Sequence, residues 1–300
     1  RTGLFPARKY SAMSRPVVSI CIPAYENPAS LVRLLDSILK QSFQDFEIVV
    51  SDDSPGDLLT NLIHSYADPR IRYFHNSVPL GSPENWNQAI AHASGVFVKV
   101  MHHDDWFASS LSLERMVSVM KEKSADMLFA QAMNMSTDGI LSVNSPRMED
   151  VRKMLEHPFS LFFQNIIGAP SATLYKKGIL KYDRNLRWFV DVEFYSSMIS
   201  SGAVVEYLPE ELICIGVDGP RVTNEYESNF ANVAEEFFYS WYKCKRDGRL
   251  FSAESYYWLY KFFKMYHTLR WRDFCPYLRV LSVPMAFVLW IVLKVKMAIR

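Results

Sequence analysis

Glycine is scarce in the first part of this chain. The 300 residues include 11 glycines, and none lies between Gly3 and Gly56. Dinucleotide-binding domains and P-loop enzymes carry a glycine-rich phosphate loop directly after an early strand. Because the chain has no such loop in its early part, the sequence excludes both of these nucleotide-binding classes.

Cysteine and excess charge are scarce as well. The four cysteines, Cys21, Cys214, Cys244 and Cys275, lie far apart and form no CxxC pair. We therefore expect no disulfide framework, and the thiols are typical of a protein in a reducing compartment. The net charge is only +1. A chain so close to neutrality has no overall attraction to a polyanion, and we expect no nucleic-acid partner.

The chain also lacks an apolar run of the roughly 20 residues that a transmembrane helix needs. The nearest approach is a fourteen-residue run from Val280 to Leu293, interrupted by one serine and one proline. Residues 270–300 hold six basic side chains, several aromatics and a single acid. This mixture is typical of a segment resting on an anionic membrane surface, and a buried helix is the alternative. We expect a cytoplasmic protein that is peripheral on the inner face of the membrane, with residues 277–300 as its membrane-associating segment.

The remaining composition indicates one domain with an appendage. Residues 1–13 lack the apolar core of a signal peptide, and Met13 is a candidate natural start, so we expect an N-terminal extension or expression remnant there. The hydrophobic share of 49% is ample for a core. From about Phe230 onward the sequence is rich in aromatics and helical in pattern. We expect an α/β domain at 14–218 and a helical C-terminal region at 219–300.

Strand and helix patterns alternate along the first half of the chain. Apolar, β-branched runs at 17–22, 46–51 and 96–101 are typical of strands that are buried on both faces. Amphipathic stripes follow, and the first is preceded by Asn27 as a helix cap with Pro28 behind it. This alternation predicts a mostly parallel sheet flanked by helices.

Polar side chains gather where these strands end. They are Tyr25, Asp52, Asp53 and the consecutive His102, His103, Asp104 and Asp105. Because right-handed crossovers bring the ends of parallel strands to one edge, we expect these residues around a shared crevice. Carboxylates there can hold a hard divalent cation. Zinc stays open, although its ligands are usually spaced along the chain, and a solvated acidic turn is the remaining alternative.

Another acidic position lies at the start of a later helical pattern. Asp191 follows aromatic residues, and the pattern behind it stops at Gly202. Asp191 could cap this helix, or it could take a proton from a bound hydroxyl. Glu193 is the second candidate for the role of base.

Four segments together carry a resemblance to a known family. They are SICIPAY at 19–25, SILKQSF at 37–43, FEIVVSDDS at 46–54 and HHDD at 102–105. In this order and spacing they closely resemble the family 2 glycosyltransferases of bacterial polysaccharide biosynthesis, over roughly residues 16–215. The resemblance implies a GT-A fold, an α/β domain with a mixed, mostly parallel sheet flanked by helices.

The resemblance also implies roles for individual residues. Contacts to a nucleotide sugar fall on Pro23, Tyr25, Asp52, Asp53, His102 and His103, with Asp52 supporting the loop of Asp53. The metal ligands fall on Asp104 and Asp105, with Mg²⁺ or Mn²⁺ as the cofactor, and the catalytic base falls on Asp191, with Glu193 as its fallback.

The sequence departs from the family pattern at three positions. His102 stands where the family has the first aspartate of its DxD motif, and Val190 stands where an ED-like motif has an acidic residue. The family often has a histidine after the last strand of its sheet, for which Asp218 is the only candidate substitute here.

The implied activity is an inverting transfer of a sugar from a UDP-, GDP- or dTDP-linked donor to a hydroxyl of a glycan or lipid-linked acceptor, in surface polysaccharide synthesis. One base suffices for direct displacement, and no nucleophile with an adjacent base is visible for a two-step route. Two alternatives stay open. One is a catalytically silent carbohydrate-binding or scaffolding protein on the same fold, and the other is a sugar nucleotidyltransferase, which would need a glycine-rich phosphate loop.

Overall fold

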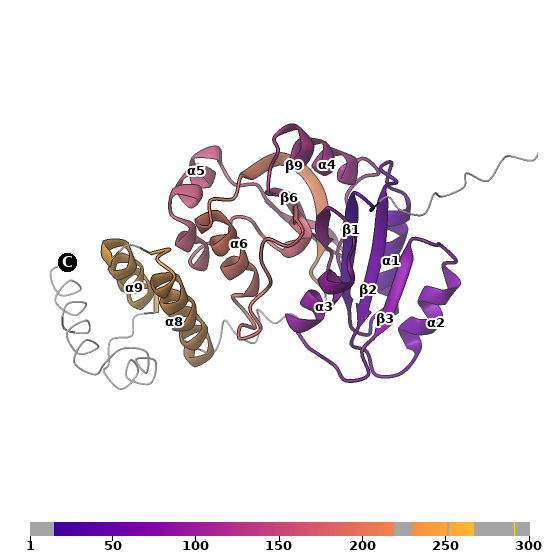
Figure 1. The fold of residues 1–300 in the computed structure, drawn as a ribbon, viewed down its shortest axis with the longest axis horizontal. Coiled ribbons are helices and arrows are strands. Elements are labelled where there is room, and N and C mark those ends of the chain that lie inside the picture. Colours follow the sequence, from indigo (N-terminus) through magenta and orange to yellow (C-terminus); the bar gives the residue numbers. More distant parts are fainter. Residues whose placement is uncertain (1–14, 219–229, 251, 267–290, 292–300) are drawn as a thin grey trace, which may run out of the picture.

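A mixed sheet forms the centre of the molecule, with helices on both faces (Figure 1). The computed structural model describes residues 15–218, 230–250, 252–266 and 291. Over these residues the sheet has nine strands in the order β3-β2-β1-β4-β8-β6-β9-β5, and β7 pairs with β6. This architecture confirms the predicted α/β class.

The first part of the sheet is parallel. Its strands are β1 (Val18–Ala24), β2 (Phe46–Asp52), β3 (Ile71–His75) and β4 (Phe97–Val100). The two strands β1 and β2 are buried along their whole length, as their nearly unbroken apolar sequences predict. Both β2 and β4 pair in parallel with β1, which therefore ends between two strands whose polar exits lie at the same edge.

The second part of the sheet mixes strand directions. Its strands are β5 (Trp106–Phe107), β6 (Met127–Ser136), β7 (Gly139–Asn144), β8 (Thr173–Lys176) and β9 (Val205–Gly216). The short strand β8 joins the two parts, because it runs antiparallel to both β4 and β6. The long strands β6 and β9 are parallel to each other, and β5 runs antiparallel to β9. The end of β9 thereby reaches the turn that follows β4.

The two faces of the sheet carry separate apolar clusters. One face is covered by α1 (Pro28–Leu39), α2 (Leu58–Ser65) and α4 (Ser112–Glu122). The other face is covered by α3 (Glu84–His92), α5 (Met148–Glu156) and α6 (Val190–Ser200), with 3₁₀ turns at Pro158–Phe162 and Pro170–Ala172. Asn27 caps α1 as predicted, since its side chain accepts a hydrogen bond of 3.2 Å from the backbone N–H of Ser30.

Two helices extend the second cluster beyond the sheet. They are α8 (Phe230–Arg246) and α9 (Ser252–Tyr266). Phe237 and Phe262 stack with ring centroids 4.0 Å apart, and Phe237 also meets Phe159 at 5.5 Å. The candidate membrane-associating segment at 277–300 lies outside the described residues, apart from Ile291. None of the described helices combines the length and the apolar character needed to span a bilayer.

Candidate functional site

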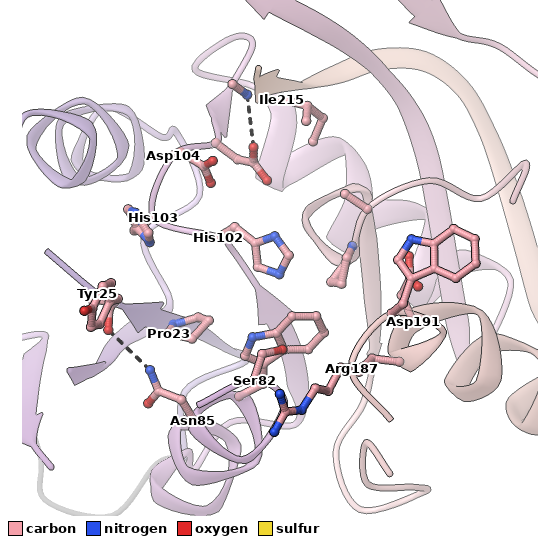
Figure 2. Close-up of a pocket in the computed structure, with 18 of the residues that line it drawn as sticks. Pro23, Tyr25, Ser82, Asn85, His102, His103, Asp104, Arg187, Asp191 and Ile215 are labelled. Carbon is pink, nitrogen blue, oxygen red and sulfur yellow. Dashed lines mark hydrogen bonds between the residues drawn. The ribbon is translucent and has the colours of Figure 1, made fainter. Parts of the chain in front are cut away.

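A cavity of about 650 Å³ opens where β1 and β4 end and where β9 meets the turn after β4. Figure 2 shows side chains from these strands on one side and Asp191 of α6 on the other. The lining includes the predicted residues Pro23, Tyr25, Asp53, His102, His103, Asp104, Asp105 and Asp191. The polar strand ends and the later acidic helix start therefore lie around one space.

The turn after β4 gathers three metal-ligating side chains. One ligand atom each from His102, Asp104 and Asp105 lies within 4.8 Å of the other two. The turn is closed by the backbone N–H of Asp105, which donates to the carbonyl of His102 at 3.1 Å. Arg33 holds the outer side by donating to the Asp104 carbonyl at 2.8 Å.

The residues of this turn fit a bound divalent cation. His102 Nε2 and Asp105 Oδ2 are buried and have no hydrogen-bond partner among the described residues. Burial lowers the pKa of His102 to about 4, so the imidazole is neutral near pH 7 and offers a lone pair. Burial and the charge of Asp104 raise the pKa of Asp105 to about 7, a cost that a cation would offset. Carboxylate oxygens with one imidazole nitrogen suit Mn²⁺, and the carboxylates also suit Mg²⁺.

A buried lysine and a serine support this turn from below. Lys99 on β4 is fully buried, and its ammonium donates to the carbonyl of Ser171. The hydroxyl of Ser171 accepts from the backbone N–H of His102 at 3.0 Å. The metal-ligating turn is therefore fixed to the strand beneath it through hydrogen bonds.

Gly216, at the end of β9, lies against the same turn. Its N–H donates to Asp105 Oδ1 at 3.1 Å. A Cβ added at this position would lie 2.4 Å from the backbone oxygen of Asp104 and 3.2 Å from an Arg33 nitrogen. Only glycine fits between strand and turn here.

The other end of the cavity is formed by the exits of β1 and β2. Tyr25 is half-exposed at this end, and Pro23 lies beside it (Figure 2). Asp53 lines the cavity while its two oxygens accept hydrogen bonds of 2.8 Å from Asn76 and from the backbone N–H of Gly81. Asp53 therefore fixes the loop that follows β3 against the cavity.

Asp52 does not line the cavity. It is fully buried, and it accepts hydrogen bonds from the hydroxyl of Tyr73 at 2.6 Å and the N–H of Ser54 at 2.8 Å. Adjacent residues at a strand end point to opposite sides, so only one of the two carboxylates reaches the crevice. The structure places Asp52 as a support of the Asp53 turn.

Asp191 lies in the first turn of α6 and lines the cavity opposite the metal-ligating turn (Figure 2). Its Oδ2 accepts a hydrogen bond of 2.9 Å from the amide of Asn165, and its Oδ1 accepts one of 2.9 Å from the N–H of Val192. Burial raises the pKa of Asp191 to about 6. A carboxylate with this pKa is a stronger base than an ordinary aspartate, and it is still ionised at neutral pH.

Glu193 and Asp218 lie away from the cavity. Glu193 is buried on another side of α6, where it accepts from the hydroxyl of Ser197 at 2.6 Å and pairs with Lys243 at 3.0 Å. Asp218 is exposed and accepts from the N–H of Thr137 at 2.9 Å. The fallback base and the substitute for the family's histidine are thus both engaged in contacts outside the cavity.

Other residues of the lining carry no motif that the sequence analysis could use. Those with polar or aromatic side chains include three amides, two tryptophans and one arginine: Asn85, Trp86, Asn134, Asn165, Arg187 and Trp188. Trp86 packs against His102 with ring centroids 4.8 Å apart. Asn85 and Trp86 lie on α3, Asn134 lies on β6, and the other three lie in loops, so no common sequence pattern identifies them.

Two curated relatives resemble parts of the chain. An uncharacterized protein of Mycobacterium tuberculosis is 29% identical over 214 residues, covering 66% of each chain. The Escherichia coli UDP-Glc:alpha-D-GlcNAc-diphosphoundecaprenol beta-1,3-glucosyltransferase WfgD is 28% identical over 114 residues, covering 38% of this chain and 44% of that protein. The matches span less than two thirds of the length of these relatives.

Solved structures share the fold. Staphylococcus aureus TarS 1-349 in complex with UDP has a TM-score of 0.59 at 17% identity, covering 82% of this chain and 72% of that one. The Pyrobaculum calidifontis mannosyltransferase PcManGT, in complex with GDP-Man and Mn²⁺, has a TM-score of 0.56 at 16% identity, covering 96% and 76%. These likenesses confirm the GT-A fold.

The sequence profile of the family described as "Glycosyl transferase family 2" matches residues 19–183, more than half of the chain. The matched range holds the strand exits at Tyr25, Asp53 and Asp104, and it ends shortly before Asp191. The chain therefore belongs to glycosyl transferase family 2.

Proposed function

We propose that this protein is an inverting glycosyltransferase that moves a sugar from a nucleoside-diphosphate donor to a hydroxyl of a glycan or lipid-linked acceptor in surface polysaccharide synthesis. The observation that carries the proposal is that one cavity holds a metal-ligating turn and, opposite it, a single buried carboxylate. Transfer of a glycosyl group needs positive charge at the departing diphosphate and a base at the attacking hydroxyl.

The donor side of the cavity is the end formed by the exits of β1, β2 and β4. Pro23, Tyr25 and Asp53 surround the nucleoside, and His102, Asp104 and Asp105 hold the cation. A bound Mg²⁺ or Mn²⁺ supplies the positive charge that a departing diphosphate requires. The solved relatives with UDP and with GDP-Man and Mn²⁺ support a donor of this class.

The acceptor side of the cavity is the start of α6. Asp191 takes the proton from the attacking hydroxyl, and Asn165 orients the carboxylate by donating to its Oδ2. Among the described residues Asp191 is the one carboxylate that reaches the cavity from α6, and one such base suffices for direct displacement with inversion at the sugar carbon. Glu193 cannot serve as this base from its position, since its charge is neutralised by Lys243.

A lipid-linked acceptor agrees with the activity in the name of WfgD, whose acceptor is a diphosphoundecaprenol-linked sugar. Such an acceptor would be met at the inner face of a membrane. Residues 277–300 are the segment of this chain with the composition to rest there.

A melting-temperature panel tests the donor assignment. UDP, GDP and dTDP are each added with and without Mn²⁺, and nucleotide sugars of the nucleotide that stabilises most are then compared in the same way. Ligand that binds only the folded state raises the apparent stability by mass action, so we expect one nucleotide to raise the melting temperature clearly, and more so with Mn²⁺. If all three nucleotides leave the melting temperature unchanged with Mn²⁺ present, the donor assignment is wrong.

A catalytically silent protein is the second candidate, favoured by His102 and Val190 at positions where the family has acids. Release of the nucleoside diphosphate from the nucleotide sugar that the panel selects separates the two. A glycosyltransferase hydrolyses its donor slowly in the absence of acceptor, and Asp191→Asn should suppress that hydrolysis. A binding protein shows only the background rate.

Gly216→Ala is expected to disrupt the metal-ligating turn without touching a ligand. The new Cβ would collide with the backbone oxygen of Asp104, so the turn must shift and the Mn²⁺-dependent affinity for the nucleoside diphosphate should fall. Calorimetric titration measures this affinity. Gly178→Ala is the control, because its added Cβ meets nothing within 4 Å and its left-handed backbone brings strain alone. Normal Mn²⁺-dependent affinity in Gly216→Ala would contradict the assigned role of the turn.

A further inference from the structure

The chain that leads into α6 sets the direction of Asp191. Phe189 occupies the N-cap position of α6 and makes no side-chain capping hydrogen bond. The backbone N–H of an N-cap residue has no partner within the helix, and the N–H groups of the residues before it need acceptors as well. Here the residues just ahead of α6, Arg187 and Trp188, also line the cavity. A group that binds the backbone N–H groups of residues 187–189 therefore also holds this wall of the cavity.

The acceptor is a carboxylate from another helix. Glu236 of α8 accepts a hydrogen bond of 2.9 Å from each of the backbone N–H groups of Arg187, Trp188 and Phe189. Its side chain is buried, with the residue 8% exposed. Backbone donors to a carboxylate form charge-assisted hydrogen bonds, and a negative charge is favourable at a helix N-terminus. Glu236 thus holds the chain where it enters α6, through the N-cap residue Phe189 and the two residues before it, and we call this contact the Glu236 cap.

Further contacts from α8 hold the segment on both sides of this cap. Ahead of it, Asp183 accepts from Lys243 at 2.6 Å and from the hydroxyl of Tyr239 at 2.9 Å. Behind it, Lys243 pairs with Glu193 at 3.0 Å. In Figure 1 α8 lies beside α6, apart from the sheet. The segment 183–193 is therefore held from α8, which lies outside the range that matches the family profile.

We propose that Glu236 is a positioning residue for the base Asp191: by binding the backbone of residues 187–189 from α8, it fixes where the chain enters α6 and hence where the first turn carries the carboxylate into the cavity. This role rests on the proposed function of Asp191. Glu236 does not line the cavity. It acts through the backbone of residues 187–189, whose placement determines where the first turn of α6 begins.

The chain offers a matched pair of substitutions. In Glu236→Gln one carboxylate oxygen becomes an NH₂ group, which faces backbone donors and cannot accept from them. The neighbouring Glu235 is exposed, so Glu235→Gln makes the same chemical change on the same helix without touching the cap. Glu236→Asp keeps the charge with a shorter reach, and it serves as a milder variant where the glutamine variant folds poorly.

Two measurements on the full chain test the proposal. Amide hydrogen exchange of peptides covering residues 183–193 reports the cap directly. Release of nucleoside diphosphate from the panel-selected nucleotide sugar, followed against pH, reports the base. In Glu236→Gln we expect faster exchange in 183–193 and unchanged affinity for UDP, GDP or dTDP with Mn²⁺. Turnover should be lower by about tenfold or more, and the pH below which turnover falls (the pH limb) should be displaced. Glu236→Asp should be intermediate, and Glu235→Gln should match wild type.

Unchanged exchange in 183–193 would overturn the proposal, and so would faster exchange with normal turnover and a normal pH limb. If neither Glu236 variant folds while Glu235→Gln does, Glu236 supports the whole fold and the positioning role is wrong. Failure of the proposed function is recognised separately, because Asp191→Asn would then leave turnover unchanged in an otherwise wild-type chain, whatever the exchange data show for Glu236.

Discussion

Asp104→Ala is expected to abolish the Mn²⁺-dependent part of donor binding while leaving the fold intact. Removing a metal-ligating carboxylate should weaken Mn²⁺-dependent affinity by about a hundredfold or more, since loss of outer-shell partners alone costs 10–100-fold. The fold should survive because Arg33 donates to the backbone carbonyl of Asp104, and this hydrogen bond remains in the variant. Calorimetric titration of the selected nucleoside diphosphate with and without Mn²⁺ measures the effect.

The control for this variant is Asp138→Ala, which removes an exposed carboxylate in the turn between β6 and β7. It should bind nucleotide and Mn²⁺ as wild type does. Unchanged affinity of Asp104→Ala in the presence of Mn²⁺ would reject the metal site. A loss of affinity in both variants would indicate that overall charge, and not ligation, governs binding.

Asp191→Asn should show the second large effect, on turnover. Loss of a general base lowers the rate by about a hundredfold or more, while donor affinity should stay close to wild type because the nucleotide end of the cavity lies at β1 and β2. Turnover of the wild type should fall as the pH drops through about 6, because burial raises the pKa of Asp191 to that value and only the ionised form accepts a proton. In Asp191→Asn the turnover should no longer show this fall with pH (the pH limb).

Stability provides a separate check on Asp191. Its pKa is higher in the folded chain than in the unfolded one, so the folded state favours the protonated carboxyl. Its contribution to stability is therefore present at low pH and lost as the pH rises through about 6. At neutral pH Asp191→Asn removes a buried charge and loses one accepted hydrogen bond, and because these two effects oppose each other it should melt close to wild type. Glu193→Gln, which breaks an ion pair with Lys243, should melt lower and keep the pH limb. If Glu193→Gln loses the limb instead, the base is misassigned.

The sequence was sufficient to predict the fold and the convergence of distant polar residues. The buried strand patterns at β1 and β2 and the rule that parallel strands end at one edge predicted that Tyr25, Asp53 and Asp104 would share a space. Each of these side chains follows a strand whose direction is fixed by its parallel partner. The order and direction of the strands therefore bring these side chains together, and predicting this does not require knowledge of side-chain packing.

The order of preference between neighbouring carboxylates rested on the family resemblance, because the residue pattern alone does not distinguish them. Asp52 and Asp53 differ by one residue at a strand end, and only the pleat decides which of them reaches the cavity. Asp191 and Glu193 are two residues apart on a helix, which turns their side chains by about 200°. The first pair consists of two aspartates and the second of an aspartate and a glutamate, so residue type does not decide between them. The deciding contacts, such as Lys243 on Glu193, come from an element far along the chain.

The cap that Glu236 provides was invisible for the same reason. The carboxylate oxygens of Glu236 accept from backbone N–H groups, which every residue except proline possesses. No side-chain pattern at 187–189 therefore indicates the contact. Arg187 and Asn165 likewise reach the cavity from loops whose course depends on tertiary packing.

Proton NMR of the sugar released from an α-linked nucleotide sugar tests the central claim most directly. The reaction contains the full chain, Mn²⁺ and the nucleotide sugar that the melting panel selects, with water as the acceptor. Direct displacement with Asp191 as the base predicts that the β-anomer appears first, in wild type and not in Asp104→Ala or Asp191→Asn. Initial release of the α-anomer, or equal release by all three proteins, would contradict the account.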